Sequence, residues 1–113
     1  MGDLRNAWED MKRQELDKCS GADRTELSKI YKNVFADHLG QKLDGYEDYC
    51  RLARNHMDLS RLRKLEAEVQ QTIRHYGNVL AGIQSNSQLI RRIVRRFCDD
   101  HLSSMSKAVA LRT

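Results

Sequence analysis

Proline is absent from this chain of 113 residues, although average usage of about 5% predicts about five or six. Because proline removes a backbone donor and clashes with the preceding helical turn, its absence favours long, uninterrupted helices. Aromatic residues are also scarce, at 6% against 32% charged residues, and a sheet protein would need more valine, isoleucine, tyrosine and threonine. The composition therefore predicts an all-α protein whose amphipathic helices surround a narrow core.

Cysteine occurs only three times, at Cys19, Cys50 and Cys98, and no two of these form a CxxC pair. An odd, widely spaced set argues against a disulfide framework and for reduced thiols. The chain also lacks an apolar run of about 18 residues, and its first segment, MGDLRNAWEDMKRQ, is charged where a signal peptide would be apolar. We therefore expect an intracellular protein, cytoplasmic or nuclear, with no membrane span.

The length suits a single helical domain over residues 1–113. From the spacing of apolar residues, the predicted helices cover about 3–18, 24–56, 59–84 and 87–106. The second helix has a possible break at 40–44, because Gly40 could end a helix and Asp44 with Glu47 forms a capping-box pattern. The apolar stripe stays in phase across this break, which favours one kinked helix.

The third predicted helix carries an apolar seam whose steps of three or four residues are typical of coiled-coil packing. The seam consists of Leu62, Leu65, Val69, Ile73, Tyr76, Leu80 and Ile83. A polar run, QSNSQ at 84–88, follows it and offers serine and asparagine as helix N-caps. If this run is a turn, the chain forms a three- or four-helix bundle with coiled-coil character. If it is helical, residues 59–106 form one helix of about 70 Å.

We expect the bundle, because this pentapeptide is the densest polar interruption in the second half of the chain. The alternative is an extended helical hairpin that partner helices complete, since so long a helix would not be stable alone.

Basic residues concentrate at the C-terminal end, where residues 85–113 hold six Lys or Arg and two Asp or Glu. In QLIRRIVRRFCDDH, a helical projection places Cys98 and His101 on the apolar half and the arginines on the other. These arginines are Arg91, Arg92, Arg95 and Arg96. Asp99 and Asp100 follow Arg95 and Arg96 at i, i+4 spacing, so they would neutralise part of the basic face.

The same stretch raises the question of a metal or catalytic site. Cys98 and His101 could share a metal ion with Cys50 and His56, but no CxxC or HExxH pattern is present. The adjacent aspartates point about 100° apart, and neighbouring arginines would keep them ionised rather than poised for proton transfer. We therefore expect no metal, no cofactor and no enzymatic activity.

The first predicted helix is too short to be stable alone and has to dock through Leu4, Trp8 and Met11. Trp8 is either part of a lid on the chain's own bundle or an anchor inserted into a partner, because tryptophan is favoured at interface hot spots.

These features favour a non-enzymatic protein–protein interaction module, a subunit or adaptor that assembles with partner helices or with copies of itself in an intracellular complex. The residues predicted to bind the partner are Trp8, the seven seam residues and the four arginines, which would select an acidic surface. The alternative is a nucleic-acid-binding helical domain that uses the arginine-rich helix 89–102.

Overall fold

The computed structural model describes residues 3–53 and 56–111, which form helices joined by short connections. The elements are α1 (Asp3–Asp17), α2 (Gly21–Ile30), a π-helical turn η1 (Tyr31–Phe35), α3 (His38–Leu52), α4 (Leu59–Ala81), α5 (Gln88–Arg96), a second π-helical turn η2 (Phe97–His101) and α6 (Leu102–Ala110). No strand occurs in these two ranges. The all-α prediction is confirmed.

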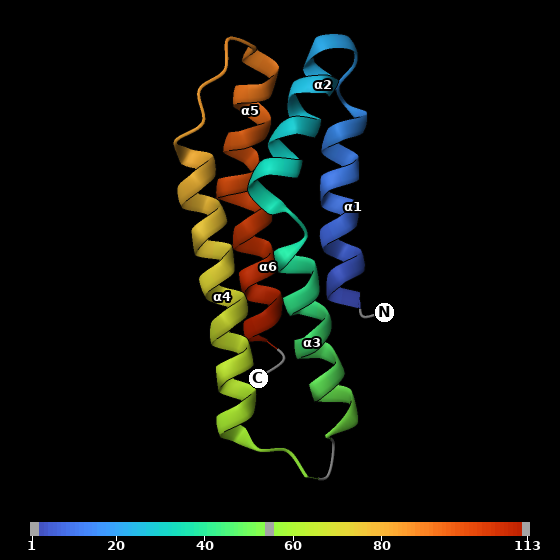
Figure 1. Cartoon of the computed structure of the whole chain (residues 1–113), viewed down its shortest axis with the longest axis vertical. Coiled ribbons are helices and arrows are strands. Elements are labelled where there is room, and N and C mark those ends of the chain that lie inside the picture. Colours follow the sequence, from blue (N-terminus) through green and yellow to red (C-terminus); the bar gives the residue numbers. More distant parts are fainter. Residues whose placement is uncertain (1–2, 54–55, 112–113) are drawn as a thin grey trace.

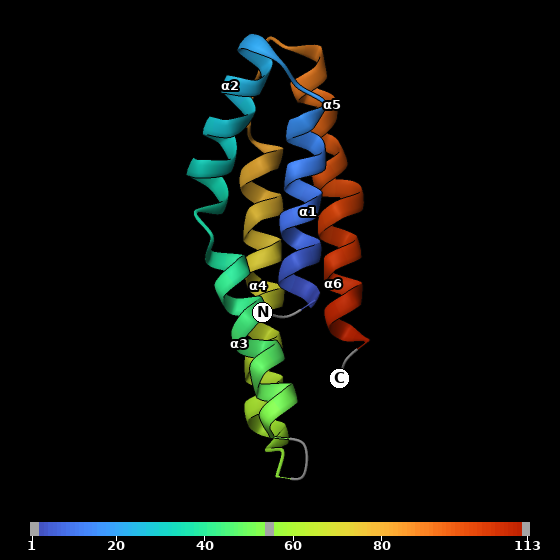
Figure 2. The same cartoon turned by 90° about the vertical axis from the view of Figure 1, so that its right-hand side faces the viewer.

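The helices stand side by side as four columns along one long axis (Figures 1 and 2). The first column is α1, the second is α2, η1 and α3, the third is α4, and the fourth is α5, η2 and α6. Successive columns run in opposite directions (Figure 1), and the molecule measures 51 × 23 × 20 Å. Among the described helices, none combines the length and the apolar character needed to cross a bilayer.

The chain turns between α4 and α5, so the alternative of one helix over 59–106 is wrong. Helix α4 ends at Ala81. The next helix begins after Ser87, whose Oγ accepts a hydrogen bond from the backbone N–H of Ile90 at 3.3 Å. A serine at this position satisfies one of the free amides of the first turn, as the sequence of the polar run predicts.

The second column is interrupted at Ala36 and Asp37, and not at 40–44, the position that the sequence offered for a break within one kinked helix. Both residues have left-handed backbone angles, with φ of 39° and 59°, which side chains other than glycine rarely adopt. The Tyr76 hydroxyl reaches this break from α4. It donates to the carbonyl of Phe35 at 2.5 Å and accepts from the amide of Leu39 at 2.9 Å. A side chain from another column therefore satisfies the backbone groups that the break releases.

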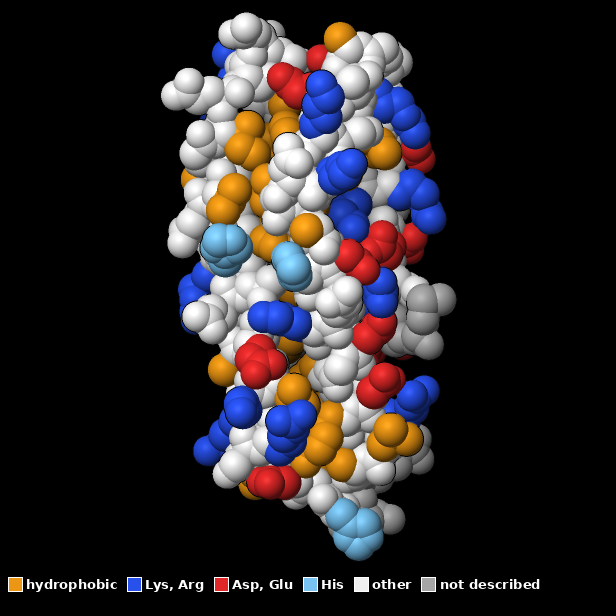
Figure 3. Space-filling model, in the orientation of Figure 1, with side chains coloured by type: hydrophobic (Ala, Val, Ile, Leu, Met, Phe, Trp, Pro, Cys, Tyr) orange, Lys and Arg blue, Asp and Glu red, His pale blue; other side chains and the backbone are white. Residues whose placement is uncertain are grey.

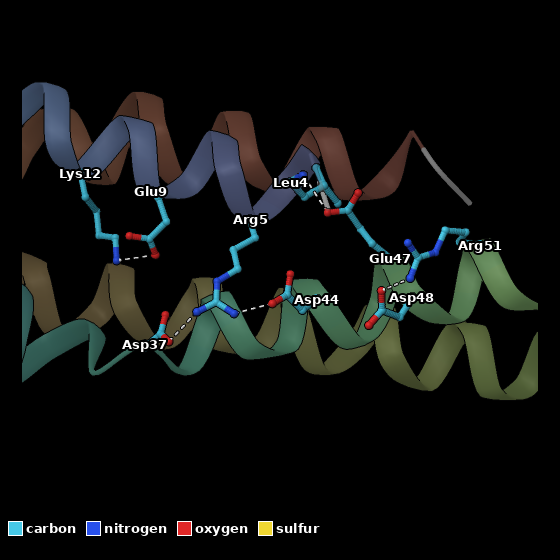
Figure 4. Close-up of polar contacts among 9 residues, drawn as sticks. All are labelled: Leu4, Arg5, Glu9, Lys12, Asp37, Asp44, Glu47, Asp48 and Arg51. Carbon is cyan, nitrogen blue, oxygen red and sulfur yellow. Dashed lines mark hydrogen bonds and ion pairs between the residues drawn. The ribbon is translucent and has the colours of Figure 1, made fainter. Parts of the chain in front are cut away.

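The residues predicted to break the helix instead attach α3 to α1 (Figure 4). The Glu47 carboxylate accepts a hydrogen bond from the backbone N–H of Leu4 at 2.7 Å, so it caps α1 rather than its own helix. Asp44 pairs with the guanidinium of Arg5, which also lies 2.8 Å from Asp37. Gly40 is buried beneath Asp37 and Arg5, where a β-carbon would collide with the Asp37 carboxylate.

One aromatic ring from each column meets at the centre of the molecule. The four rings belong to Trp8, Phe35, Tyr76 and Phe97, all of which are buried. Trp8 stacks on Tyr76 with ring centroids 6.1 Å apart and meets Phe35 edge-on at 5.0 Å. Because aromatic contacts of this kind add to the free energy of burial, the cluster joins all four columns at one level.

Candidate protein-interaction surface

Trp8 is fully buried, with 0% of its surface exposed. Its ring lies in the aromatic centre, and the ammonium of Lys12 sits 5.4 Å from the ring centroid. Trp8 therefore attaches α1 to the chain's own core. Of the two roles that the sequence allows for Trp8, this is the intramolecular lid. Its predicted role as an anchor in a partner is incompatible with this conformation, because a partner could reach it only after α1 had detached.

The coiled-coil seam of α4 is also occupied by the chain's own helices. Five seam residues are buried: Leu62, Val69, Ile73, Tyr76 and Leu80. Leu65 and Ile83 are partly buried against the same core. The α3–α4 contact is the most extensive between any two elements. The seam therefore cannot receive a partner helix without opening the fold, except where Leu80 and Ile83 border the surface at the end of α4.

Three of the four predicted arginines are exposed, namely Arg91, Arg92 and Arg95. The predicted pair between Arg95 and Asp99 is present, with Nε and Oδ2 3.8 Å apart, but both side chains are largely in solvent. Such a pair leaves the guanidinium available to another anion, since exposed ion pairs contribute little.

Arg96 makes a different contact from the one predicted. Its Nη1 lies 2.9 and 2.7 Å from the two carboxylate oxygens of Glu15 in α1, and no contact joins it to Asp100 within the described residues. Arg96 therefore belongs to the packing of α1 against α5 rather than to the exposed basic face. This leaves three arginines on that face.

Glu15 is the polar residue that sequence reasoning missed. Only 1% of its surface is exposed, and it also accepts from the ammonium of Lys18 at 2.7 Å, while His101 Nε2 lies 3.5 Å away. Burial would raise the pKa of its carboxyl, but the hydrogen bonds from Lys18 and Arg96 outweigh burial and hold the pKa below its usual range. One signal was available, because Glu15 follows Trp8 by seven residues and so lies on the apolar stripe of α1.

A surface recess runs between the end of α4 and the first turns of α5, and we call it the arginine groove. Its volume is about 310 Å³. Five of its lining residues are apolar, namely Leu80, Ala81, Ile83, Val94 and Cys98. The others are Ser85 and three charged residues, Arg91, Arg95 and Asp99, so the charge of the lining is positive by one. The arginine groove therefore brings together two features that the sequence predicted, because the last seam residues, Leu80 and Ile83, lie beside Arg91 and Arg95 of the basic helix.

The walls of the arginine groove are held in place by local contacts. The guanidinium of Arg91 donates to the carbonyl of Ser85 at 3.4 Å, and the Ser85 hydroxyl donates to the Glu26 carboxylate in α2 at 2.7 Å. The Cys98 thiol donates to the carbonyl of Gly77 in α4 at 3.8 Å. Burial, aided by the nearby Asp99 carboxylate, raises the pKa of this thiol, so Cys98 serves as a neutral apolar wall.

The residues considered for a metal or for catalysis are separated in the structure. Cys98 faces Gly77 in α4, whereas His101 faces Glu15 in α1. Within residues 3–53 and 56–111, no three His, Cys, Asp or Glu side chains are grouped so that they could hold a metal ion. Asp99 and Asp100 lie on the exposed face. These contacts assign Cys98 and His101 to helix packing.

Comparison of the chain with models of known protein families, with curated proteins and with solved structures finds no match.

Proposed function

We propose that the protein is a non-enzymatic helical interaction module that binds an acidic amphipathic helix of a partner protein in the arginine groove. The observation that carries the proposal is an apolar floor edged by two exposed guanidinium groups in one recess. The module would act as a subunit or adaptor of an intracellular complex. Free thiols at Cys19, Cys50 and Cys98 support a reducing compartment.

The charge of the groove favours an acidic occupant. The Arg95 side chain is 84% exposed and has only the distant Asp99 carboxylate as a partner among the described residues. Arg91 contacts a carbonyl and no carboxylate there. A guanidinium presents a planar set of donors that matches a carboxylate, so glutamate or aspartate side chains are its natural complement.

The shape of the groove favours a helix as the carrier of those carboxylates. Leu80 in α4 and Val94 in α5 come from two neighbouring columns and both line the recess between them. An amphipathic helix that lies in such a furrow inserts residues spaced i, i+3, i+4 and i+7 and places its polar flanks along the rim. The recess has room for a few apolar side chains, which is the usual size of an interface hot spot.

A non-enzymatic role is supported by the burial and the hydrogen bonds of the Glu15 carboxylate. The carboxylate is buried and receives hydrogen bonds from Arg96 and Lys18. A catalytic carboxylate needs access to a substrate and a pKa near the working pH. Glu15 has neither, because its contacts are filled and its pKa is lowered.

We further propose that the four columns constitute an antiparallel four-helix bundle with coiled-coil character. The steps of three and four along the α4 seam support this assignment. So does the meeting of one aromatic ring from each column at a single level, since bundle cores are built in such layers.

The proposal is tested with a fluorescently labelled helical peptide of about 18 residues, or five turns, that has leucines along one stripe and glutamates on both flanks. We expect the peptide to bind, and we expect its affinity to fall about tenfold in the variant Arg91→Gln/Arg95→Gln because the paired charges are lost. A second variant, Ala81→Trp, fills the mouth of the groove without removing charge. Fluorescence anisotropy measures both.

The matched control is Arg63→Gln/Arg74→Gln, which removes two exposed arginines of α4 outside the groove. It should bind the acidic peptide as the unaltered protein does, and a peptide with lysines in place of glutamates should not bind. The proposal fails if neither groove variant weakens binding.

Duplex DNA and single-stranded RNA serve as competing probes, because Arg91, Arg92 and Arg95 would also suit phosphates. If either binds with an affinity that falls steeply with salt and the acidic peptide does not bind, nucleic-acid binding replaces this proposal. Light scattering shows whether the occupant is a second copy of the chain, since the mass would then rise with concentration.

A further inference from the structure

The two helices of the α3–α4 hairpin end in exposed leucines. Leu52 is the last residue of α3 and is 79% exposed, and Leu59 is the first residue of α4 and is 61% exposed. Met57 precedes Leu59 by two residues, is half-buried and packs against the core. We call Leu52 and Leu59 the hairpin tip. These two leucines flank the connection at the end of the molecule, beside the exposed His56 and Asp58, and large apolar side chains this exposed are a feature of interaction sites.

Cations surround the base of the hairpin tip. Arg61, Arg63 and Lys64 lie in the first two turns of α4, all are exposed, and none makes an ion pair with another described residue. Helical side chains lean towards the N-terminus of their helix, so these three lean towards the tip. Over residues 51–64 the sequence holds five Lys or Arg and a single Asp. We call Arg61, Arg63 and Lys64 the cationic collar.

The remaining polar contacts make the tip rigid. The Tyr49 hydroxyl accepts from the amide of Asp58 at 2.9 Å and donates to its carbonyl at 3.3 Å. The Asp58 carboxylate caps α4 by accepting from the amides of Ser60 and Arg61 at 2.9 and 3.4 Å. The start of α4 is therefore joined to α3, so the backbone on either side of Leu59 is already ordered before binding.

The tip also lies where a flat surface can reach it. The α3–α4 hairpin extends past the ends of α1 and α6 along the long axis (Figure 2). In the space-filling view, apolar side chains gather in the lower part of the molecule where α3 and α4 meet, with basic side chains beside them over α4 and a histidine below them at the extreme lower end (Figure 3). The arginine groove lies at the opposite end of α4, so the two surfaces can be occupied independently.

We propose that the hairpin tip docks on an anionic lipid bilayer. Leu52 and Leu59 enter the boundary between headgroups and acyl chains, and the cationic collar contacts the lipid phosphates and carboxylates. Peripheral attachment of this kind combines buried apolar area with attraction to anionic lipids and needs no spanning helix.

A bilayer fits the tip better than a protein surface does. The two leucines offer roughly 100 Å² of apolar area each, whereas stable protein interfaces bury about 1,200–2,000 Å² in total. Each side chain that inserts into a bilayer contributes its own free energy of burial. The bilayer surface can also deform around a convex tip. The unpaired cations of the collar add attraction over a short range, within about 10 Å of an anionic surface at moderate salt.

Flotation with lipid vesicles tests this inference. We expect the protein to float with phosphatidylcholine vesicles that contain about 30% phosphatidylserine, and to stay largely unbound with phosphatidylcholine alone. The variant Leu52→Ser/Leu59→Ser should lower the partition coefficient by at least tenfold, because the apolar insertion is lost. The variant Arg61→Gln/Arg63→Gln/Lys64→Gln should lower it by roughly 100-fold, at about fivefold for each cation near the surface.

The matched control is Arg91→Gln/Arg92→Gln/Arg95→Gln, which removes the same charge from α5. It should float as the unaltered protein does, and it also separates this inference from the proposed function of the arginine groove. All substituted side chains are exposed, so thermal unfolding of each variant should match the unaltered protein.

Three results would overturn the inference. The first is absence of flotation on the anionic vesicles at low salt. The second is flotation that the α5 control abolishes and the tip variants leave intact, because the arginine helix would then be the lipid-binding face. The third is a rise in mass with protein concentration that Leu52→Ser/Leu59→Ser removes in the absence of flotation, because the tip would then contact a second copy of the chain.

Discussion

Arg96 and Glu15 lie 81 residues apart in sequence and form an ion pair in which only 2% of the Glu15 side chain is exposed. The contact fixes α1 against the end of α5, immediately before the π-helical turn η2. Because a wrong register of these helices would leave the Glu15 carboxylate buried without a partner, we expect the pair to specify how α1 packs against the fourth column.

Replacement of Glu15 by glutamine should lower the free energy of unfolding by about 2–3 kcal/mol. This is below the loss of about 3–5 kcal/mol for a fully buried pair, because 36% of the Arg96 side chain remains in water. Urea denaturation measures the change. The variant Asp10→Asn removes the exposed pair with Arg13 and should cost less than about 1 kcal/mol. Equal losses in the two variants would contradict this account.

Acid should destabilise the protein through Glu15. The folded pKa of this carboxyl is lowered, so its stabilising contribution is complete above the unfolded pKa of about 4.3 and is lost as the pH falls through the folded pKa. We expect thermal midpoints of the unaltered protein to fall below about pH 4. The fall should be smaller in Glu15→Gln, which has no carboxyl to protonate. Parallel curves for the two proteins would show that other groups control the acid transition.

Two tyrosines provide a matched test of the break in the second column. Tyr76→Phe removes the hydroxyl that bonds the Phe35 carbonyl and the Leu39 amide, and it should cost about 1–3 kcal/mol because buried backbone groups lose a partner. Tyr31→Phe removes a buried hydroxyl that has no hydrogen-bond partner among the described residues. Its cost should be near zero. Chemical denaturation that ranks the two in the opposite order would contradict the role given to Tyr76.

Two glycines within α3 should respond to alanine in opposite directions. Gly40→Ala places a methyl group against the Asp37 carboxylate and the Arg5 guanidinium, so we expect a loss of about 1–3 kcal/mol. At Gly45, nothing lies within 4 Å of an added β-carbon, and the gain in helix propensity should stabilise the protein by about 0.5–1 kcal/mol. Thermal unfolding distinguishes the two, and stabilisation by Gly40→Ala would show that the contact with Asp37 is dispensable.

Local signals in the sequence were sufficient for part of the fold. The N-caps Asp58 and Ser87 act through amides two or three residues away, so their patterns predict where α4 and α5 begin. The break at Ala36 and Asp37 could not be predicted in this way. It depends on the Tyr76 hydroxyl from a distant part of the chain, and the glycine and capping-box pattern at 40–47 indicated the wrong position.

The sequence predicted which residues belong to the candidate site better than it predicted what those residues contact. The seam and the basic helix were recognised, but a seam spacing is the same whether the opposing helix is in the same chain or in another one. Val69 and Ile73 consequently turned out to be core residues. The arginine groove arises only where the end of that seam meets Arg91 and Arg95 after the chain has turned.

The turn η2 has a consequence for how the fourth column tolerates length changes. Phe97 and Leu102 are both buried although they are five residues apart, a spacing that ordinary helical winding does not place on one side and that a π-helical turn does. The apolar stripes of α5 and α6 therefore follow two helical registers that are offset by one residue at the turn. Deletion of a single residue within 98–101 would bring Phe97 and Leu102 to a spacing of four, which ordinary α-helical winding places on one face, so we expect α6 to keep Met105 and Val109 in the core. The same deletion within α5 would instead rotate the residues on its two sides by about 100° relative to each other.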